Sequence, residues 1–255
     1  MRRGEKIDMA RAEAADIFMQ SRRSYGSRRL SKALKIKGYD RGRHAVRKIM
    51  RELGLAAKVK RKFVTTTESN PRKEAFGNIV NRDFAPRRAG ACDVWFSDIT
   101  YIDTKEGWLY FFALMDKDTR RILAHECSLT LGAESAVKCI ETAKLASSSK
   151  KAVIHHSDRG SQYTADDFVK AAMEGGIKLS MSRKGNCWDN AVMESLFATL
   201  KKEWTDGKIY RTRQEAQKDI NDFVYRYYND FRLHSSLGYK TPNETNTLFR
   251  VLQKT

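Results

Sequence analysis

The chain has 255 residues, of which 41% are apolar, so it is long enough for one sizeable core and a smaller second domain. No apolar run approaches the roughly 20 residues that cross a bilayer, and the first residues lack the apolar stretch of a secretory signal. The four cysteines form no CxxC pair, and no histidine pair has zinc-ligand spacing. We therefore expect a globular, cytoplasmic protein with reduced thiols and no membrane partner.

The positive charge is concentrated in the first third of the chain. Residues 1–90 carry 25 Lys and Arg against 9 Asp and Glu, whereas residues 91–255 carry 24 against 22. A basic segment of this kind is typical of a polyanion partner, since each cation that neutralises a phosphate releases condensed counterions. The composition thus favours a nucleic-acid-binding protein over one with a merely soluble, highly charged surface.

The basic third begins with a helix-permissive stretch, residues 8–24. Ser27 can then cap a short helix that Gly38 ends. A second helix is predicted from about residue 41 to residue 53, stopping at Gly54. The two short helices would meet across a tight turn.

The second of these helices has an apolar face and a basic face. The residues at i, i+3, i+4 and i+7 spacing, which we expect to face inward, are Val46, Ile49, Met50 and Leu53. The side chains expected to face outward are Arg43, His44, Arg47, Lys48 and Arg51. Such a helix can read DNA by reaching phosphates and base edges in a major groove, although an ordinary helical hairpin with a solvated basic face has the same pattern. We predict a helix-turn-helix DNA-binding domain at residues 1–57.

The sequence changes character twice after this domain. Residues 58–92 lose periodicity and carry two of the three prolines with further basic residues, which indicates a basic linker laid against DNA. The elements then predicted are strands at 94–103, 108–116 and 121–128, a helix at 132–147, a strand at 153–158, a helix at 164–175, a strand at 178–182 and a long helix from about 188. This order indicates an α/β domain at residues 93–255, with a mixed sheet covered by helices on both faces.

Three carboxylates stand at positions suited to chemistry. Asp98 lies within a buried strand pattern, where a lone carboxylate costs several kcal/mol unless positive charge meets it. Asp158 follows a strand and precedes a glycine turn, where α/β sheets present their functional groups. Glu194 borders the apolar stripe of the last long helix, and Lys201, seven residues later, lies within about 20° of it around the helix axis.

Carboxylates that converge need a strong positive charge among them, and hard oxygen ligands suit Mg²⁺ or Mn²⁺. We therefore expect Asp98, Asp158 and Glu194 to hold two metal ions, which activate a nucleophilic oxygen and stabilise the leaving oxygen of a displacement at phosphorus. Taken singly, each acid has the ordinary alternative of a capping or surface carboxylate. Together with the basic first third, the three acids indicate metal-dependent chemistry on DNA.

Four segments resemble the OrfB-type transposases of the insertion-sequence-three family, members of the DDE superfamily that also holds retroviral integrases. They are WFSDITYI, HSDRGSQYTADDF, GNCWDNAVMESLFATLKKE and YNDFRLHSSLGYKTPNE, and 35 residues separate Asp158 from Glu194, as in that family. The resemblance runs from about residue 25 to residue 244. It implies an RNase H-like integrase core with a C-terminal helical tail, Asp98, Asp158 and Glu194 as the catalytic triad, and Lys201 as a DNA contact.

The resemblance also implies a reaction and partners. Metal-assisted hydrolysis frees a 3′-OH at an element end, and this hydroxyl then attacks another phosphodiester with neither a covalent enzyme intermediate nor a nucleotide cofactor. The implied partners are double-stranded DNA of the element ends and target, further copies of the chain assembled on DNA, and an upstream-frame protein or fusion. The alternatives are a DNA-binding regulator that keeps the acids as relics, and a simple RNase H-like nuclease that cuts without joining.

Three further features leave alternatives open. Either His155 or His156 can touch DNA or a metal-bound water, while the other is packed. Trp188 and Asn190, beside the third acid, can position DNA or cap and pack the helix. The tail YRYYNDFRLHSSLGY can stack and pair with nucleic acid, or form a helix that closes over the core and ends in an ordered turn.

Overall fold

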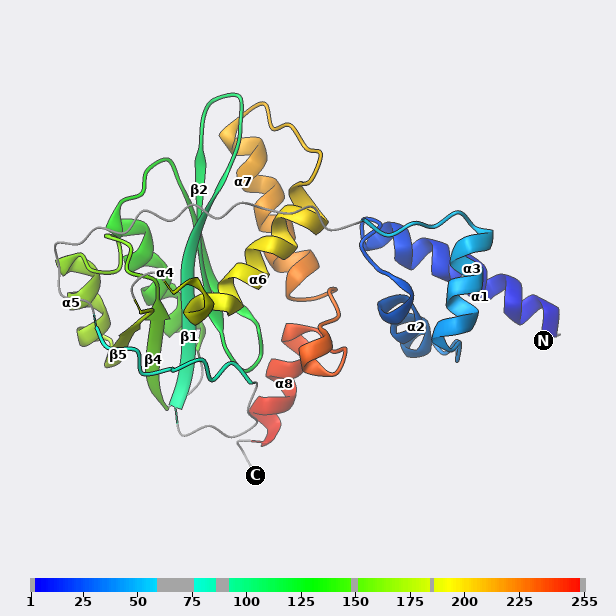
Figure 1. The fold of residues 1–255 in the computed structure, drawn as a ribbon, viewed down its shortest axis with the longest axis horizontal. Coiled ribbons are helices and arrows are strands. Elements are labelled where there is room, and N and C mark those ends of the chain that lie inside the picture. Colours follow the sequence, from blue (N-terminus) through cyan, green and yellow to red (C-terminus); the bar gives the residue numbers. More distant parts are fainter. Residues whose placement is uncertain (1–2, 59–75, 86–91, 148–150, 184–185, 253–255) are drawn as a thin grey trace.

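The computed structural model describes residues 3–58, 76–85, 92–147, 151–183 and 186–252. Within these residues, a unit of helices lies beside a larger domain built on one mixed sheet (Figure 1). No helix in the described ranges is long and apolar enough to span a bilayer.

The N-terminal unit consists of α1 (Arg3–Gln20), α2 (Ser27–Ile36) and α3 (Arg43–Glu52). Their apolar faces share one core, in which Phe18, Leu30, Leu34 and Val46 are fully buried. Gly38 and Gly54 follow α2 and α3 with φ of +86° and +64°, the left-handed conformation in which helices commonly end. The predicted pair of short helices and their ends are thus confirmed.

Two details of this unit differ from the prediction. Gly26, not Ser27, is the N-cap of α2, so Ser27 is already the first helical residue. Leu53 is exposed rather than inward, because it is the C-cap residue of α3 and lies beyond the last helical turn that contacts the core.

The sheet domain contains the strands β1 (Cys92–Ile102), β2 (Leu109–Asp116), β3 (Ile122–Ser128), β4 (Ala152–Ser157) and β5 (Ile177–Met181). In the described part of the chain they form one sheet in the order β3-β2-β1-β4-β5. β2 is antiparallel to β1 and β3, whereas β4 runs parallel to β1 and β5. Because Phe96 pairs with His156, Asp98 and Asp158 reach the same level of neighbouring strands.

Helices cover both faces of the sheet (Figure 1). One face packs against α4 (Ala133–Ala146) and α5 (Asp166–Glu174). The other packs against α6 (Ala191–Thr199), the π-helical turn η2 (Leu200–Thr205), α7 (Arg213–Asp222) and the π-helical turn η3 (Phe223–Tyr228). A 3₁₀ turn, η1 (Cys187–Asn190), precedes α6, and the chain continues through η4 (Ser235–Leu237) into α8 (Pro242–Leu252). The predicted mixed sheet between two helical layers is confirmed.

The described part of the predicted linker, residues 76–85, packs on the sheet domain. Val80 belongs to the same hydrophobic core as the buried residues of α6, and Asn78 and Arg82 donate hydrogen bonds to the Asp189 carboxylate at 3.0 and 2.8 Å. Hydrogen bonds from Arg183 hold the pKa of Asp189 well below its usual range. The remaining predicted linker, residues 59–75 and 86–91, lies outside the described residues, and the domain limits at 57 and 92 stay a prediction.

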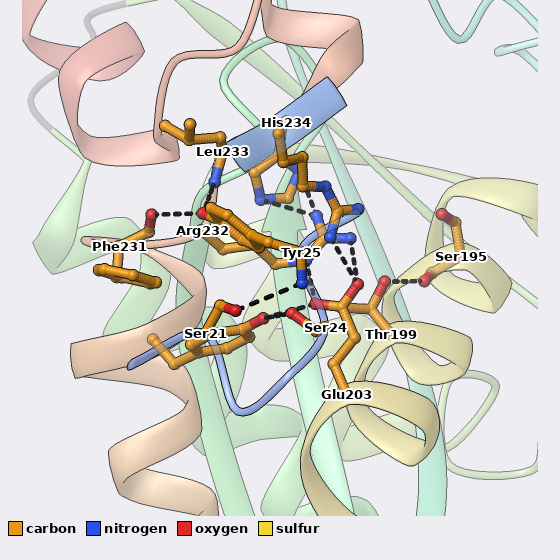
Figure 2. A network of polar contacts seen from close by, with 12 residues as sticks. Ser21, Ser24, Tyr25, Ser195, Thr199, Glu203, Phe231, Arg232, Leu233 and His234 are labelled. Carbon is orange, nitrogen blue, oxygen red and sulfur yellow. Dashed lines mark hydrogen bonds and ion pairs between the residues drawn. The ribbon is translucent and has the colours of Figure 1, made fainter. Parts of the chain in front are cut away.

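A buried ion pair lies where the N-terminal unit meets the sheet domain (Figure 2). The Arg232 guanidinium donates to both carboxylate oxygens of Glu203, at 2.7 and 3.0 Å. Arg29 of α2 donates to the same carboxylate at 2.9 Å, and the Tyr227 hydroxyl does so at 2.7 Å. One carboxylate of η2 therefore holds the tail of the sheet domain and a helix of the N-terminal unit together.

A tyrosine hydroxyl adds a second connection (Figure 2). The Tyr25 hydroxyl donates to the Phe231 carbonyl at 3.0 Å and accepts from the Leu233 N–H at 2.9 Å. Arg232 and His234 are buried beside it. The tail is thus a helix that closes over the core and ends in an ordered turn, and these two basic side chains are not available for stacking with nucleic acid.

Candidate active site

Asp98 stands on the central strand of the sheet, opposite Ala113 of β2. One of its carboxylate oxygens accepts the N–H of Ile99 at 2.8 Å. Burial raises the pKa of Asp98 well above its ordinary value, Asp158 and Glu194 raise it further, and the Ile99 N–H and Lys201 oppose the rise. The other two predicted acids and the predicted lysine therefore all lie within electrostatic reach of Asp98.

Asp158 directly follows β4 in a tight turn. Its carboxylate accepts the N–H of Gly160 at 2.9 Å, while burial raises its pKa. A Cβ at Gly160 would stand 2.7 Å from the Gln162 side chain and 3.0 Å from the Asp158 carboxylate. The glycine thus lets the turn pass close to the carboxylate that its own N–H fixes.

Glu194 lies in the first turn of α6, and Lys201 lies in η2, which continues α6. The apolar stripe that the sequence indicates for this helix is buried against the sheet: Val192, Met193, Leu196, Phe197, Leu200 and Trp204. Packing of the stripe carries Glu194 to the side of β1. The sequence therefore located correctly the elements that bring the three acids together, and the catalytic role of the acids stays a prediction.

The acids do not form a closed metal cage in this conformation. Among the described residues, no group of three or more His, Cys, Asp or Glu side chains is gathered closely enough to hold a metal ion. Asp98 and Asp158 each direct one oxygen to a backbone N–H instead. The donor set nonetheless fits a hard divalent cation, because its ligand atoms are oxygens and a cation would offset both the burial and the repulsion that raise the pKa of Asp98.

Tyr163 is near the acids and was not assigned this position from the sequence, whereas Asn190 and Trp188 were expected beside the third acid. Tyr163 is buried, and after burial itself Asp98 and Asp158 are the main causes that raise its pKa well above the ordinary value. Asn190 is buried and donates to the Ser97 carbonyl at 3.2 Å, which favours the packing role, whereas Trp188 is exposed. The signal for Tyr163 was its place five residues after Asp158, within the turn that presents that acid.

Both histidines of β4 are packed rather than one being available to a substrate. His155 shares a hydrogen bond with the Ser97 hydroxyl at 2.8 Å, and His156 shares one with Ser180 at 2.9 Å. Burial lowers the pKa of His155 to about 3 and that of His156 to about 4, so both rings are neutral. The alternation of side chains suggested one accessible ring, but β4 lies between β1 and β5 and both faces of the sheet are covered.

The basic face predicted for the second short helix is present on α3. All five of its side chains are exposed: Arg43, His44, Arg47, Lys48 and Arg51. Val46, Ile49 and Met50 are buried on the opposite face. The exposed cations are thus presented on one side of a helix that the core holds in place, although contact with DNA stays a prediction.

Comparison with known proteins identifies the family. Residues 89–187 and 175–242 match family models described as integrase core domain, and residues 5–63 match one described as HTH-like domain. The insertion element IS600 31 kDa protein of Shigella sonnei is 38% identical over 240 residues, which cover 94% of this chain and 88% of that protein. Transposase InsF of IS3A from Escherichia coli K12 is 32% identical over 227 residues, which cover 89% and 78%. This chain belongs to the IS3 family of transposases.

A solved structure supports the fold of this family member. The cryo-EM structure of the simian T-cell lymphotropic virus intasome in complex with PP2A regulatory subunit B56 gamma is similar, with a TM-score of 0.50 and 15% identity. The match covers 84% of this chain and 69% of that chain. At this identity the likeness shows the fold alone. Together with the family models it confirms the predicted RNase H-like integrase core preceded by a helix-turn-helix region.

Proposed function

We propose that this IS3-family member is a DDE transposase that cuts DNA at the ends of an insertion sequence and joins the freed 3′ ends to a target. The observation that carries the proposal is that Asp98 on the central strand, Asp158 directly after the neighbouring β4 and Glu194 in the first turn of α6, which contacts β1, stand on adjacent elements of an integrase-type fold joined to a basic helical unit. A DNA-binding regulator needs the basic unit but not the acids. A simple nuclease needs the acids but leaves the basic unit unexplained.

Two Mg²⁺ or Mn²⁺ ions per active site are part of this proposal, with Asp98, Asp158 and Glu194 as their ligands. When bound, such ions supply Lewis-acid stabilisation of charge on the phosphate oxygens and lower the pKa of a bound water. Asp98, on the central strand, would hold the ions together with the other two acids. Gly160 and Tyr163 hold the Asp158 turn in place, and Lys201 holds a phosphate near the acids.

Strand joining on DNA that carries the element's own ends tests the function. With Mg²⁺ we expect 3′-end cleavage and transfer of that end to target DNA, and with EDTA we expect neither, although binding persists. Cleavage without joining would favour the nuclease, and binding without cleavage would favour the regulator. Gel separation of labelled strands distinguishes the three outcomes.

Lys201→Ala should lower the rate of strand joining by about 10²-fold, because the ammonium beside Asp98 is placed to stabilise charge on a phosphate. Metal binding, measured by calorimetry, should remain close to that of the wild type. The matched control is Lys202→Ala, which removes the same charge from the next position of η2. If Lys201→Ala joins strands as fast as this control, Lys201 is only a surface charge.

Arg47→Ala and Lys48→Ala should each weaken DNA binding and reduce the slope of log affinity against log salt by about one per lost phosphate contact. Both side chains lie on the exposed basic face of α3. Binding titrations at several salt concentrations measure the effect, with the exposed Lys170 of α5 as the control site for an alanine substitution. Affinity and slope unchanged from this control would remove α3 from the DNA interface.

The remaining partners belong to the same proposal. We propose assembly of several copies on the two element ends and the target, because two ends must be joined in one event. An upstream-frame protein or fusion is the further partner proposed for recognition of the ends, and the proposed location is the cytoplasm, with the protein on the nucleoid when bound to DNA. Size determination by light scattering with and without end DNA tests the assembly.

A further inference from the structure

Two large aromatic side chains form an exposed pair on the hairpin that begins with the strand of Asp98. Tyr101 is 44% exposed and Trp108 is 47% exposed, and their ring centroids lie 4.9 Å apart with the planes inclined by 71°. Single exposed aromatic residues are common on protein surfaces. Two exposed aromatic rings in contact present a larger apolar surface to solvent, which suggests a binding role.

The aromatic pair is connected to the acids through Lys201, and Tyr101 follows Asp98 by three residues on β1. The Lys201 ammonium is 5.3 Å from the centre of the Tyr101 ring, within the range of a cation–π contact. The same ammonium acts electrostatically on Asp98. Lys201, a cation suited to a phosphate, therefore contacts one ring of the aromatic pair and also acts on the first of the proposed metal ligands.

The hairpin holds the aromatic pair in a fixed position. Arg213, the first residue of α7, donates to the Trp108 carbonyl at 3.1 Å. Thr104 donates to the Gly107 carbonyl at 2.6 Å, and the Lys105 N–H donates to the Tyr210 carbonyl at 3.0 Å. Gly107 has φ of +102°, and a Cβ there would stand 2.8 Å from the Arg213 side chain. A surface ordered in advance loses little entropy when a ligand binds.

We propose that Tyr101 and Trp108 are a stacking platform for an unpaired DNA base next to the phosphate at the acids. The proposal rests on the proposed transposase function and adds a substrate feature to it, an end whose terminal base pair has opened. Every base has a π-face, so stacking on aromatic side chains tolerates any sequence. Paired bases within a duplex are already stacked on their neighbours, so the platform selects DNA with an unpaired end.

The test compares two duplexes of one arbitrary sequence, one fully paired and one with two unpaired terminal nucleotides carrying 2-aminopurine. Binding is measured in EDTA, where no strand is cut. We expect the wild type to bind the unpaired-end duplex about tenfold more tightly and to quench the 2-aminopurine fluorescence. Trp108→Leu should abolish the preference and most of the quenching and leave affinity for the paired duplex unchanged, whereas Trp108→Phe should keep both.

Two further variants make the outcome decisive. Tyr101→Leu removes the other ring and should reduce the same preference, and Tyr225→Leu removes an exposed ring that contacts His125 and should change nothing. Thermal melting checks that each variant folds. Equal loss of affinity for both duplexes, or a preference that survives in both leucine variants of the pair, overturns the platform.

Failure of the platform can be separated from failure of the proposed function. A wild type that joins strands but binds both duplexes equally contradicts the platform alone. A wild type that prefers and quenches the unpaired end but never joins strands contradicts the transposase function and leaves the platform standing.

Discussion

Asp98→Asn should abolish strand cleavage and strand joining together, with a loss of at least about 10³-fold in rate. The amide keeps the shape of the side chain but removes one of the three carboxylates proposed to hold the metal ions. DNA binding should persist, because most of the net positive charge lies in residues 1–90, which this change does not touch. Mg²⁺-dependent strand transfer beside a DNA titration measures both results.

The same variant should fold at least as well as the wild type without metal. Burial and the two neighbouring acids raise the pKa of Asp98 above its unfolded value, so its contribution to stability is complete below pH 3.8 and is lost as pH rises through the folded pKa. Above its folded pKa the wild-type side chain is therefore an unfavourably buried charge, which the neutral amide lacks. Thermal melting in EDTA should show an equal or higher melting temperature for Asp98→Asn.

The matched control is Asp103→Asn, which makes the same change at an exposed acid just beyond β1 and should keep full activity. Activity retained in Asp98→Asn would remove the two-metal assignment. Loss of activity together with loss of folding would make Asp98 a structural acid.

The sequence predicted the sheet domain well because its signals are local. Each strand has its own apolar run, and the stripe on α6 repeats at helical spacing, so the observed limits of β1, β2 and β3 differ from those expected by at most two residues. The acids were found for the same reason. Asp98 interrupts an apolar run, Asp158 follows one, and Glu194 borders a stripe.

Contacts between distant segments were not predictable in this way. Glu203 is separated from Arg232 by 29 positions and from Arg29 by 174, and periodicity shows only the helix face on which such a residue lies. The burial of both His155 and His156 was not predictable either. Alternation along one strand does not show that helices cover both faces of the sheet. The ion pairs of Glu203 depend on the tertiary fold, because packing of the tail brings Arg232 to η2.

The second large effect is expected for Arg232→Ala, which should lower the free energy of unfolding by about 3–5 kcal/mol. Arg232 and Glu203 are both buried, and their double hydrogen bond is joined by Arg29 and Tyr227. Removal of the guanidinium leaves the Glu203 carboxylate buried with only Arg29 and Tyr227 as partners. Arg226→Ala is the control, because its 3.3 Å pair with Asp222 is exposed and should contribute less than about 1 kcal/mol.

The pH dependence identifies the cause of the loss. Burial alone would raise the pKa of Glu203, but Arg232 and Arg29 lower it from 4.5 to about 2. The stabilisation is therefore complete above about pH 4.5 and is lost as pH falls through 2, so the difference between wild type and Arg232→Ala should shrink across that window. Denaturant unfolding at pH 7, 4 and 2.5 measures it, and a difference independent of pH would assign the loss to packing alone.

Arg29→Ala tests the contact between the N-terminal unit and the sheet domain without removing the Arg232–Glu203 pair within the sheet domain. Its guanidinium contacts Glu203 from α2 and is only partly buried, so its removal should cost less than that of Arg232 and should loosen the N-terminal unit first. Glu203 lies on the η2 turn that continues the helix of Glu194. Through Arg29, the N-terminal unit therefore contacts the same continuous helix that carries the third acid. A drop in strand joining for Arg29→Ala, at unchanged affinity for DNA, would show that this contact positions Glu194. An unchanged rate of strand joining would mean that the Arg29–Glu203 contact contributes to stability alone.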